Sequence, residues 1–227
     1  MTGSRETVLA SVRRALGVTS REAPRRQEVA DRLKGHPAGV IPARGQLPPS
    51  ERIALFKDMV LAAAASLDHL PSTDEVPGAI ATYLRARNLP SSLLRGTDPR
   101  LADLPWHKEP QLDVWIGPSD GHQLVGLSHA FAGIAESGTV VLLSGQDNPT
   151  TLNFLPDHHL VVVDAREVDG DYETVWTRIR ARFGEGALPR AVNWVTGPSR
   201  SADIEQTLLL GAHGPRSLHI LLVGTVD

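Results

Sequence analysis

Hydrophobic residues near the N-terminus recur at helical spacing and then give way to a stretch without a regular pattern. Residues 4–16 predict a short amphipathic helix, for which Gly17 is a natural end. Residues 18–50 are polar and punctuated by proline and glycine, which indicates a linker or an extended strap. Because structureless segments this long are uncommon inside compact domains, we interpret residues 1–49 as an N-terminal helical arm and residues 50–227 as a separate α/β domain.

Two further helices are predicted where helical spacing returns. The first begins at Ser50, a plausible N-cap, and has one apolar face that extends to Leu67. The second covers residues 73–87, where Pro77 is tolerable because it falls in or near the first turn.

The rest of the chain alternates short aliphatic runs with helical patterns. We expect strands at residues 112–116, 139–143, 160–163, 192–196 and 218–223, and helices at residues 124–134, 172–183 and 203–210. The aliphatic runs lack a clean alternation with polar residues, which suits strands buried on both faces. Strands that alternate with helices predict a mostly parallel sheet covered by helices.

Composition narrows the chemistry available to the chain. None of the 227 residues is cysteine, which excludes disulfides, thiolate zinc sites, iron–sulfur ligation and cysteine nucleophiles. We therefore expect no redox cofactor held by this chain. The net charge of −3 and the ten aromatic residues give no reason to expect nucleic-acid binding. We find no apolar run long enough for a membrane span and no signal-peptide pattern, and so expect a cytoplasmic protein.

Charge is distributed unevenly along the chain. Residues 1–45 contain nine Lys and Arg against four Asp and Glu, a net of +5, and the remainder has a net of −8. A basic arm of this kind could dock on an acidic partner or on its own acidic body, or it could simply be a solvated segment.

A first candidate site is the turn that precedes the aliphatic run at residues 140–143. Glu136 could serve as a general base, a nucleophile or an anchor for a substrate hydroxyl, with Ser137, Gly138 and Thr139 as ligand-binding neighbours. In the alternative structural interpretation, Glu136 caps nearby backbone amides and the two hydroxyls satisfy the turn.

A second candidate follows the strand at residues 192–196. Gly197 and Ser199 lie in a Gly-Pro turn, and a helix that starts near Asp203 would offer free N–H groups to a carboxylate or phosphate, with Arg200 as a bidentate clamp. Asp203 with Gln206 also resembles a capping box, so plain helix capping explains the same run.

A third candidate, His213, precedes Gly214 where the helix at 203–210 would end. It could be catalytic or bind a metal, with Gly214 as a ligand-binding neighbour, although a histidine near a helix C-terminus is also electrostatically favourable without any chemistry. Of the other histidines, His158 and His159 are adjacent and should project from opposite faces of a strand, so they would not share a metal. The sequence contains no zinc-protease, dinucleotide-binding, P-loop or nucleophile-elbow motif.

Taken together, four segments resemble the lactate-utilisation protein C family, whose shared unit is the LUD domain. They are Gly133–Val140, Leu155–Val163, Gly197–Glu205 and Gly211–Pro215, and their order and spacing both fit. One departure is the stretch 148–154, where relatives favour an arginine in a Ser/Leu-rich run, and this puts an identical ligand in doubt.

The resemblance implies a fold and a biological setting. The fold would be a three-layer α/β/α arrangement with a mostly parallel sheet, similar to sugar-phosphate isomerases and CoA-transferases. The protein would act with an iron–sulfur protein and a cysteine-rich protein in oxidising L-lactate to pyruvate, itself without a cluster. The alternative is a free-standing binder of a small carboxylate or CoA-type ligand, or a transferase-like or isomerase-like enzyme. Whether this chain is itself catalytic stays open, because fold does not establish function.

Overall fold

A computed structural model describes residues 3–19, 21–184, 186–201, 209–211 and 213–226. The chain divides into two compact units, Met1–Val40 and Ile41–Asp227, which we take one at a time. No helix in the described ranges combines the length and the apolar character that a bilayer crossing requires.

The first unit consists of two helices, α1 (Ser4–Leu16) and α2 (Ala23–Gly35). The predicted helix at residues 4–16 is confirmed, and Gly17 ends it in the left-handed conformation with φ of 64°. The expectation of a structureless segment from residue 18 is wrong for α2. Pro24 lies in the first turn of α2, where proline is compatible with a helix, so it marks a helix start there. Neither helix contains a buried residue.

The second unit is an α/β domain, which confirms the predicted fold class. It contains, in chain order, α3 (Pro49–Ala62), β1 (Ser66–Leu70), α4 (Val76–Ala86), β2 (Ser92–Arg95), α5 (Pro99–Ala102), β3 (Asp113–Ile116), β4 (Val125–His129), β5 (Ala132–Ile134), β6 (Thr139–Leu143), α6 (Thr150–Phe154), β7 (His158–Asp164), β8 (Val168–Asp169), α7 (Tyr172–Phe183), β9 (Val192–Val195), β10 (Arg200–Ser201), β11 (Leu209–Leu210) and β12 (Ser217–Val223).

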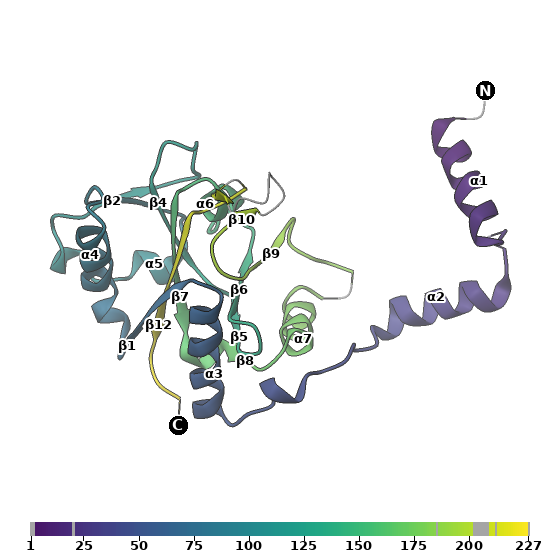
Figure 1. The fold of residues 1–227 in the computed structure, drawn as a ribbon, viewed down its shortest axis with the longest axis horizontal. Helices are drawn as coiled ribbons and strands as arrows, with labels where there is room; N and C mark the ends of the chain where they lie inside the picture. The colour runs from purple at the N-terminus through teal and green to yellow at the C-terminus, as the bar shows by residue number, and fades with distance from the viewer. Residues whose placement is uncertain (1–2, 20, 185, 202–208, 212, 227) are drawn as a thin grey trace. The chain divides into compact units, whose positions relative to one another are not determined.

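Six strands form a parallel sheet in the order β1-β12-β7-β4-β2-β3, with β7 and β4 at its centre (Figure 1). One face packs against α4 and α5, where Ile80 and Leu84 meet Leu160 and Val162 of β7. The aliphatic runs at β7 and β12 are buried on both faces, as their lack of alternation predicts.

The other face of the parallel sheet is covered by α3 together with a second sheet. This second sheet has the order β8-β5-β6-β9, and β6 pairs antiparallel with both β5 and β9. Phe56 of α3 and Val140 of β6 share one core cluster with Ile220 of β12. The outer face of the second sheet packs against α7 through Val175 and Ile179. The second sheet therefore lies between the parallel sheet and α7 (Figure 1).

Three predicted helices in this unit differ from the structure. Residues 124–134 form β4 and β5, because their small residues permit close packing of strands. At Gly126, for instance, an added Cβ would lie 2.8 Å from Pro156. The helix from residue 49 ends at Ala62, where Ala64 has φ of 59°, and Leu67 belongs to β1. Of the predicted helix at 203–210, Leu209 and Leu210 form β11, and the stretch 202–208 lies outside the described residues.

Candidate functional site

A cavity of about 230 Å³ lies beside the amino ends of β7 and β12 and the carboxyl end of β9. We call it the His159 cavity. Its lining comprises Asn153, Phe154, His159, Trp194, Val195, Thr196, Gly197, Pro198, Ser199, His213, Gly214, Pro215 and Leu218. Four predicted site residues, Gly197, Ser199, His213 and Gly214, therefore come together here. β9 belongs to the second, antiparallel sheet, so the rule that ligands bind at the carboxyl ends of parallel strands does not account for this site.

A buried polar network forms one wall of the cavity. The Ser128 hydroxyl of β4 donates to Asn153 Oδ1 of α6 at 3.0 Å, and Ser128 Oγ lies 3.0 Å from His159 Nε2 of β7. All three side chains are buried. The remaining polar atoms of the two outer side chains, His159 Nδ1 and Asn153 Nδ2, have no hydrogen-bond partner in the structure. Burial lowers the pKa of His159 to about 3, so its imidazole is neutral at physiological pH.

Hydrogen bonds between Ser199, which precedes β10, and the segment after β11 shape another wall. Ser199 N donates to Pro215 O at 2.8 Å, and His213 N donates to Ser199 Oγ at 3.3 Å. Gly214 lies against the same serine, since a Cβ there would be 3.4 Å from Ser199 Cβ. The exposed His213 follows β11 in the structure, so its predicted position at a helix C-terminus is wrong.

A cluster of hydroxyls joins the first and second predicted segments. Thr139 Oγ1 lies 2.6 Å from Thr196 Oγ1 and 2.8 Å from the Tyr172 hydroxyl. Ser137 Oγ completes the cluster at 2.7 Å from Thr139 Oγ1 and 3.0 Å from Tyr172. Thr196 also lines the His159 cavity. Antiparallel pairing of β6 with β9 is what brings these segments together.

Glu136 lies outside the cavity lining. It is buried, and its Oε1 accepts a hydrogen bond from Tyr172 N in the first turn of α7 at 3.3 Å, while Oε2 has no partner. This contact matches the structural alternative, in which the carboxylate caps backbone amides.

The remaining predicted ligand residues have contacts of their own. Arg200 is exposed and donates to Ala63 O at 3.1 Å, and Asp203 lies outside the described residues. Gly138 and Gly197, both with positive φ, are pressed against the last turns of α3. A Cβ added at Gly138 would lie 2.5 Å from Val60 N, and a Cβ added at Gly197 would lie 2.2 Å from Ala63 O.

Polar side chains also gather at the carboxyl ends of three neighbouring parallel strands. Arg95 ends β2, His129 ends β4 and Asp164 ends β7. Burial lowers the pKa of His129, and the charge of Arg100 lowers it further. The carboxylates here are already paired, Asp98 with Arg100 and Asp164 with Arg166, each at 2.6 Å. Arg95 donates to Gly96 O at 2.9 Å, although its Nε has no partner.

Neither set of polar residues was predicted from the sequence. The structure confirms that His158 and His159 project from opposite faces of β7: His158 Nδ1 lies 3.0 Å from the Tyr83 hydroxyl of α4, whereas His159 lines the cavity. The available signal was a histidine inside an otherwise aliphatic strand. Among the described residues, no group of three His, Asp or Glu side chains is placed to hold a metal ion.

Residues 119–223 match the LUD domain family model. The lactate utilization protein C of Bacillus subtilis is 36% identical over 100 residues, which is 44% of this chain and 42% of that protein. The protein of the same name from Halalkalibacterium halodurans is 34% identical over 122 residues, covering 49% and 53%. An uncharacterized Neisseria meningitidis protein is 34% identical over 115 residues, covering 51% and 48%.

Among solved structures, a DUF162 family protein from Deinococcus radiodurans superposes with a TM-score of 0.58 at 26% identity, covering 78% of this chain and 99% of that one. Residues 119–223 therefore resemble the LUD domain, and the α/β fold is similar to that of the DUF162 family structure. Several of the curated proteins that the chain resembles carry the name lactate utilization protein C. The matched stretches span about half the length of those relatives.

Proposed function

We propose that this protein is a cytoplasmic component of a lactate utilisation system that oxidises L-lactate to pyruvate. In this proposal it holds no redox cofactor and acts beside an iron–sulfur protein and a second, cysteine-rich protein. The observation that carries the proposal is the match of residues 119–223 to the LUD domain, together with relatives named lactate utilization protein C.

The composition supports the division of labour. Oxidation of lactate to pyruvate releases two electrons, and a chain without cysteine cannot ligate an iron–sulfur cluster in the usual thiolate manner. A partner with cysteine ligands would accept those electrons, while this chain binds a small molecule or organises the assembly.

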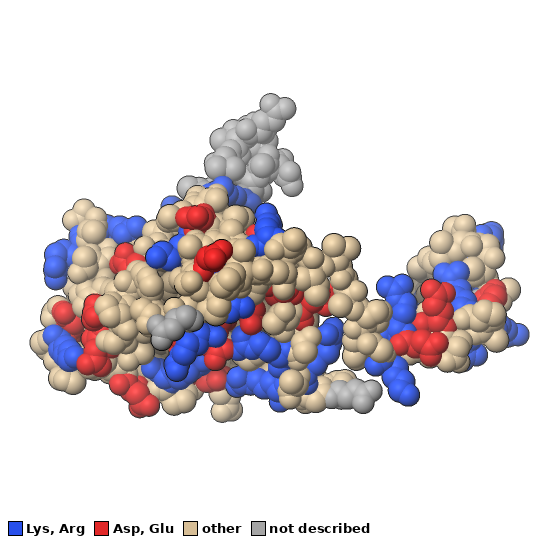
Figure 2. All heavy atoms as spheres, turned by 90° about the horizontal axis from the view of Figure 1, so that it is seen from below, with Lys and Arg blue, Asp and Glu red and all other residues tan. Residues whose placement is uncertain are grey.

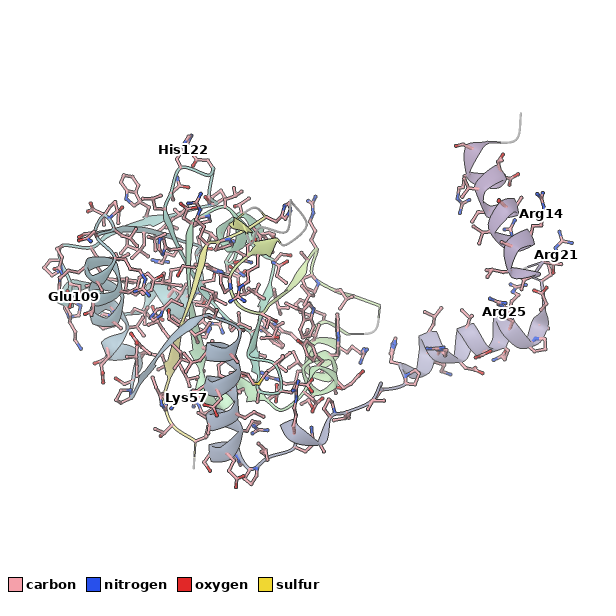
Figure 3. The ribbon with its side chains drawn as sticks, in the orientation of Figure 1. Arg14, Arg21, Arg25, Lys57, Glu109 and His122 are labelled. Atoms are coloured by element: carbon pink, nitrogen blue, oxygen red, sulfur yellow. The ribbon has the colours of Figure 1, made fainter. Side chains whose placement is uncertain are left out.

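The basic first unit supplies a candidate docking segment. Arg14 of α1, Arg25 of α2 and Arg21 between the two helices extend away from the ribbon in Figure 3. On the face of the second unit seen in Figure 2, acidic and basic side chains are interspersed. Residues 1–45 have a net charge of +5 and the remainder has a net of −8, so an acidic surface on a partner would be attracted mainly to the first unit.

The alternative of a free-standing CoA-type binder receives less support from the His159 cavity. Such ligands carry several phosphates, and phosphate recognition usually employs arginine or lysine. No lysine or arginine occurs in the described lining of the cavity. A small ligand without phosphates fits its volume and lining better.

The decisive experiment is affinity capture of the tagged chain from its native host grown on L-lactate, with the same host grown without lactate as a control. We expect an iron–sulfur protein in the eluate, and lactate-oxidising activity that the purified chain alone lacks. A chain that is captured alone, or that oxidises lactate alone at the same rate as the eluate, would contradict the proposal.

A further inference from the structure

We propose that the His159 cavity binds a small organic ligand through an alcohol hydroxyl, which lies between Asn153 Nδ2 and His159 Nδ1. The inference rests on the proposed function only for the choice of L-lactate as the first ligand to test. The preference of the cavity for a hydroxyl follows from the hydrogen-bonding groups of Ser128, Asn153 and His159.

The positions of the protons in the buried network define which hydrogen-bonding group on a ligand would match its two unpartnered atoms. Ser128 has a single hydroxyl proton and two hydrogen-bond neighbours, Asn153 and His159. It must donate to one and accept from the other. If Asn153 Oδ1 accepts, then His159 is protonated at Nε2, which leaves Nδ1 as an acceptor and Asn153 Nδ2 as a donor. The opposite amide orientation exchanges the two roles, so either arrangement leaves one donor and one acceptor.

An alcohol is the small group that satisfies both at once, because it donates one proton and accepts into its lone pairs. A carboxylate would be a poor match, since its oxygens only accept and one of them would face the lone pair of a neutral imidazole. Burial keeps that imidazole neutral by lowering the pKa of His159 to about 3.

The rest of the cavity leaves room for a carbon skeleton. Its volume of about 230 Å³ is several times the roughly 30 Å³ that one water occupies in the liquid. Phe154, Trp194 and Leu218 supply apolar walls. Apart from His159, the only titratable side chain in the described lining is the exposed His213, so a carboxylate on the ligand would point toward solvent. These features select small alcohols and 2-hydroxycarboxylates over phosphorylated ligands.

The two unpartnered nitrogens have no solvent contact in the structure. A ligand hydroxyl therefore reaches these nitrogens only when side chains around the cavity shift. Leaving buried polar groups unpartnered is unfavourable, so a ligand hydroxyl here would supply hydrogen bonds that no protein group makes to these two nitrogens.

A matched ligand series tests the hydroxyl directly. Isothermal titration calorimetry on the full chain would compare L-lactate, propionate, pyruvate and propane-1,2-diol. Propionate lacks the hydroxyl, and the pyruvate ketone only accepts. We expect both to bind at least tenfold more weakly than L-lactate, because each leaves a buried group unpaired.

Variants test whether the preference for L-lactate over propionate depends on the two side chains. Asn153→Leu and His159→Leu should reduce the preference for L-lactate over propionate to about one. The control His158→Leu alters the same strand on its opposite face and should preserve that preference. Circular dichroism and thermal melting check that each variant folds. Ser128→Ala, a smaller change, should also weaken the preference, and it keeps the test open if His159→Leu does not fold.

The outcomes separate the two proposals. Binding of L-lactate and of propane-1,2-diol, with loss in the Asn153 variant, supports both the hydroxyl site and a lactate ligand. Binding of the diol without L-lactate supports the hydroxyl site and counts against lactate as the ligand. Equal binding of propionate and L-lactate overturns the hydroxyl inference. So does the failure of every probe to bind or to shift the His159 imidazole resonances, which would mean that the network holds water only.

Discussion

Burial of single titratable residues couples the stability of this protein to pH. The unfolded chain protonates His159 as the pH falls through about 6.5, whereas the folded protein keeps it neutral down to its pKa of about 3. The unfolded state therefore binds more protons in this window, and the free energy of unfolding falls with decreasing pH. Asp169 acts in the opposite direction, because burial raises its pKa to about 6 and the folded state protonates first.

The first prediction concerns this pH dependence. Urea unfolding at pH 7, 6, 5 and 4 should show that His159→Leu has a shallower loss of stability than the wild type. The difference in slope should approach about 1.4 kcal/mol per pH unit between pH 6 and 4. Asp169→Asn should instead steepen the loss. Parallel curves for wild type and His159→Leu would mean that His159 titrates normally in the folded protein.

A second residue-scale prediction separates the two interpretations of Glu136. Glu136→Ala removes the acceptor of the Tyr172 N–H at the start of α7, and should lower the free energy of unfolding by about 1–3 kcal/mol. Glu136→Gln keeps an acceptor oxygen and should retain the fold. The exposed Glu28→Ala is the control, with an expected change below about 0.5 kcal/mol.

Growth on L-lactate then decides whether Glu136 has chemistry as well. A Glu136→Gln variant with wild-type melting temperature and normal growth supports a structural role alone. Lost growth at an unchanged melting temperature would support the catalytic interpretation that the sequence left open.

At the scale of elements, the turn between β5 and β6 fits against α3 through a glycine. Gly138 has φ of 68°, and an added Cβ would lie 2.5 Å from the backbone of α3 at Val60 N. Gly186 offers a matched control, because its φ of 72° imposes similar strain while nothing lies within 4 Å of an added Cβ.

We therefore predict that Gly138→Ala destabilises the protein far more than Gly186→Ala. The control should cost about 1 kcal/mol from backbone strain, while Gly138→Ala adds a clash that requires α3 to shift from the second sheet. Denaturant unfolding of the two variants measures the difference. Equal effects would mean that the turn adjusts without disturbing α3.

At the scale of the whole molecule, the second unit includes residues 41–49 of the predicted arm, and two of these residues pack against the rest of the unit. A Cβ at Gly45 would lie 2.2 Å from Gly170 O, and Gln46 Nε2 donates to Asp171 Oδ2 at 2.8 Å. Residues 45–46 thus pack against the start of α7, whereas α1 and α2 bury no residue.

Two truncations test this boundary. Deletion of residues 1–40 should leave the melting temperature of the second unit unchanged within about 2 °C, and should reduce capture of the proposed partners. Deletion of residues 1–49 should also lower the melting temperature, since it removes the contacts of Gly45 and Gln46. If the protein that lacks residues 1–40 still captures its partners normally, docking through the first unit is contradicted.

Part of this structure can be predicted from interactions between residues that are neighbours in the sequence. The sequence by itself determined the helix at residues 172–183 and the strand at residues 139–143, because periodicity and capping are properties of neighbouring residues. It also determined that no thiolate chemistry is available, since the chain contains no cysteine. The resemblance of four segments to a known family correctly indicated the α/β fold.

The tertiary structure alone decided the strands at residues 125–134, where small buried residues serve close packing and carry no strand periodicity. It also decided the site. Asn153, Ser128 and His159 come from a helix and two neighbouring strands, and their unpartnered nitrogens become visible only when β4 and β7 pair. No pattern along the chain encodes that meeting, because strand order and side-chain burial depend on contacts between residues distant in sequence.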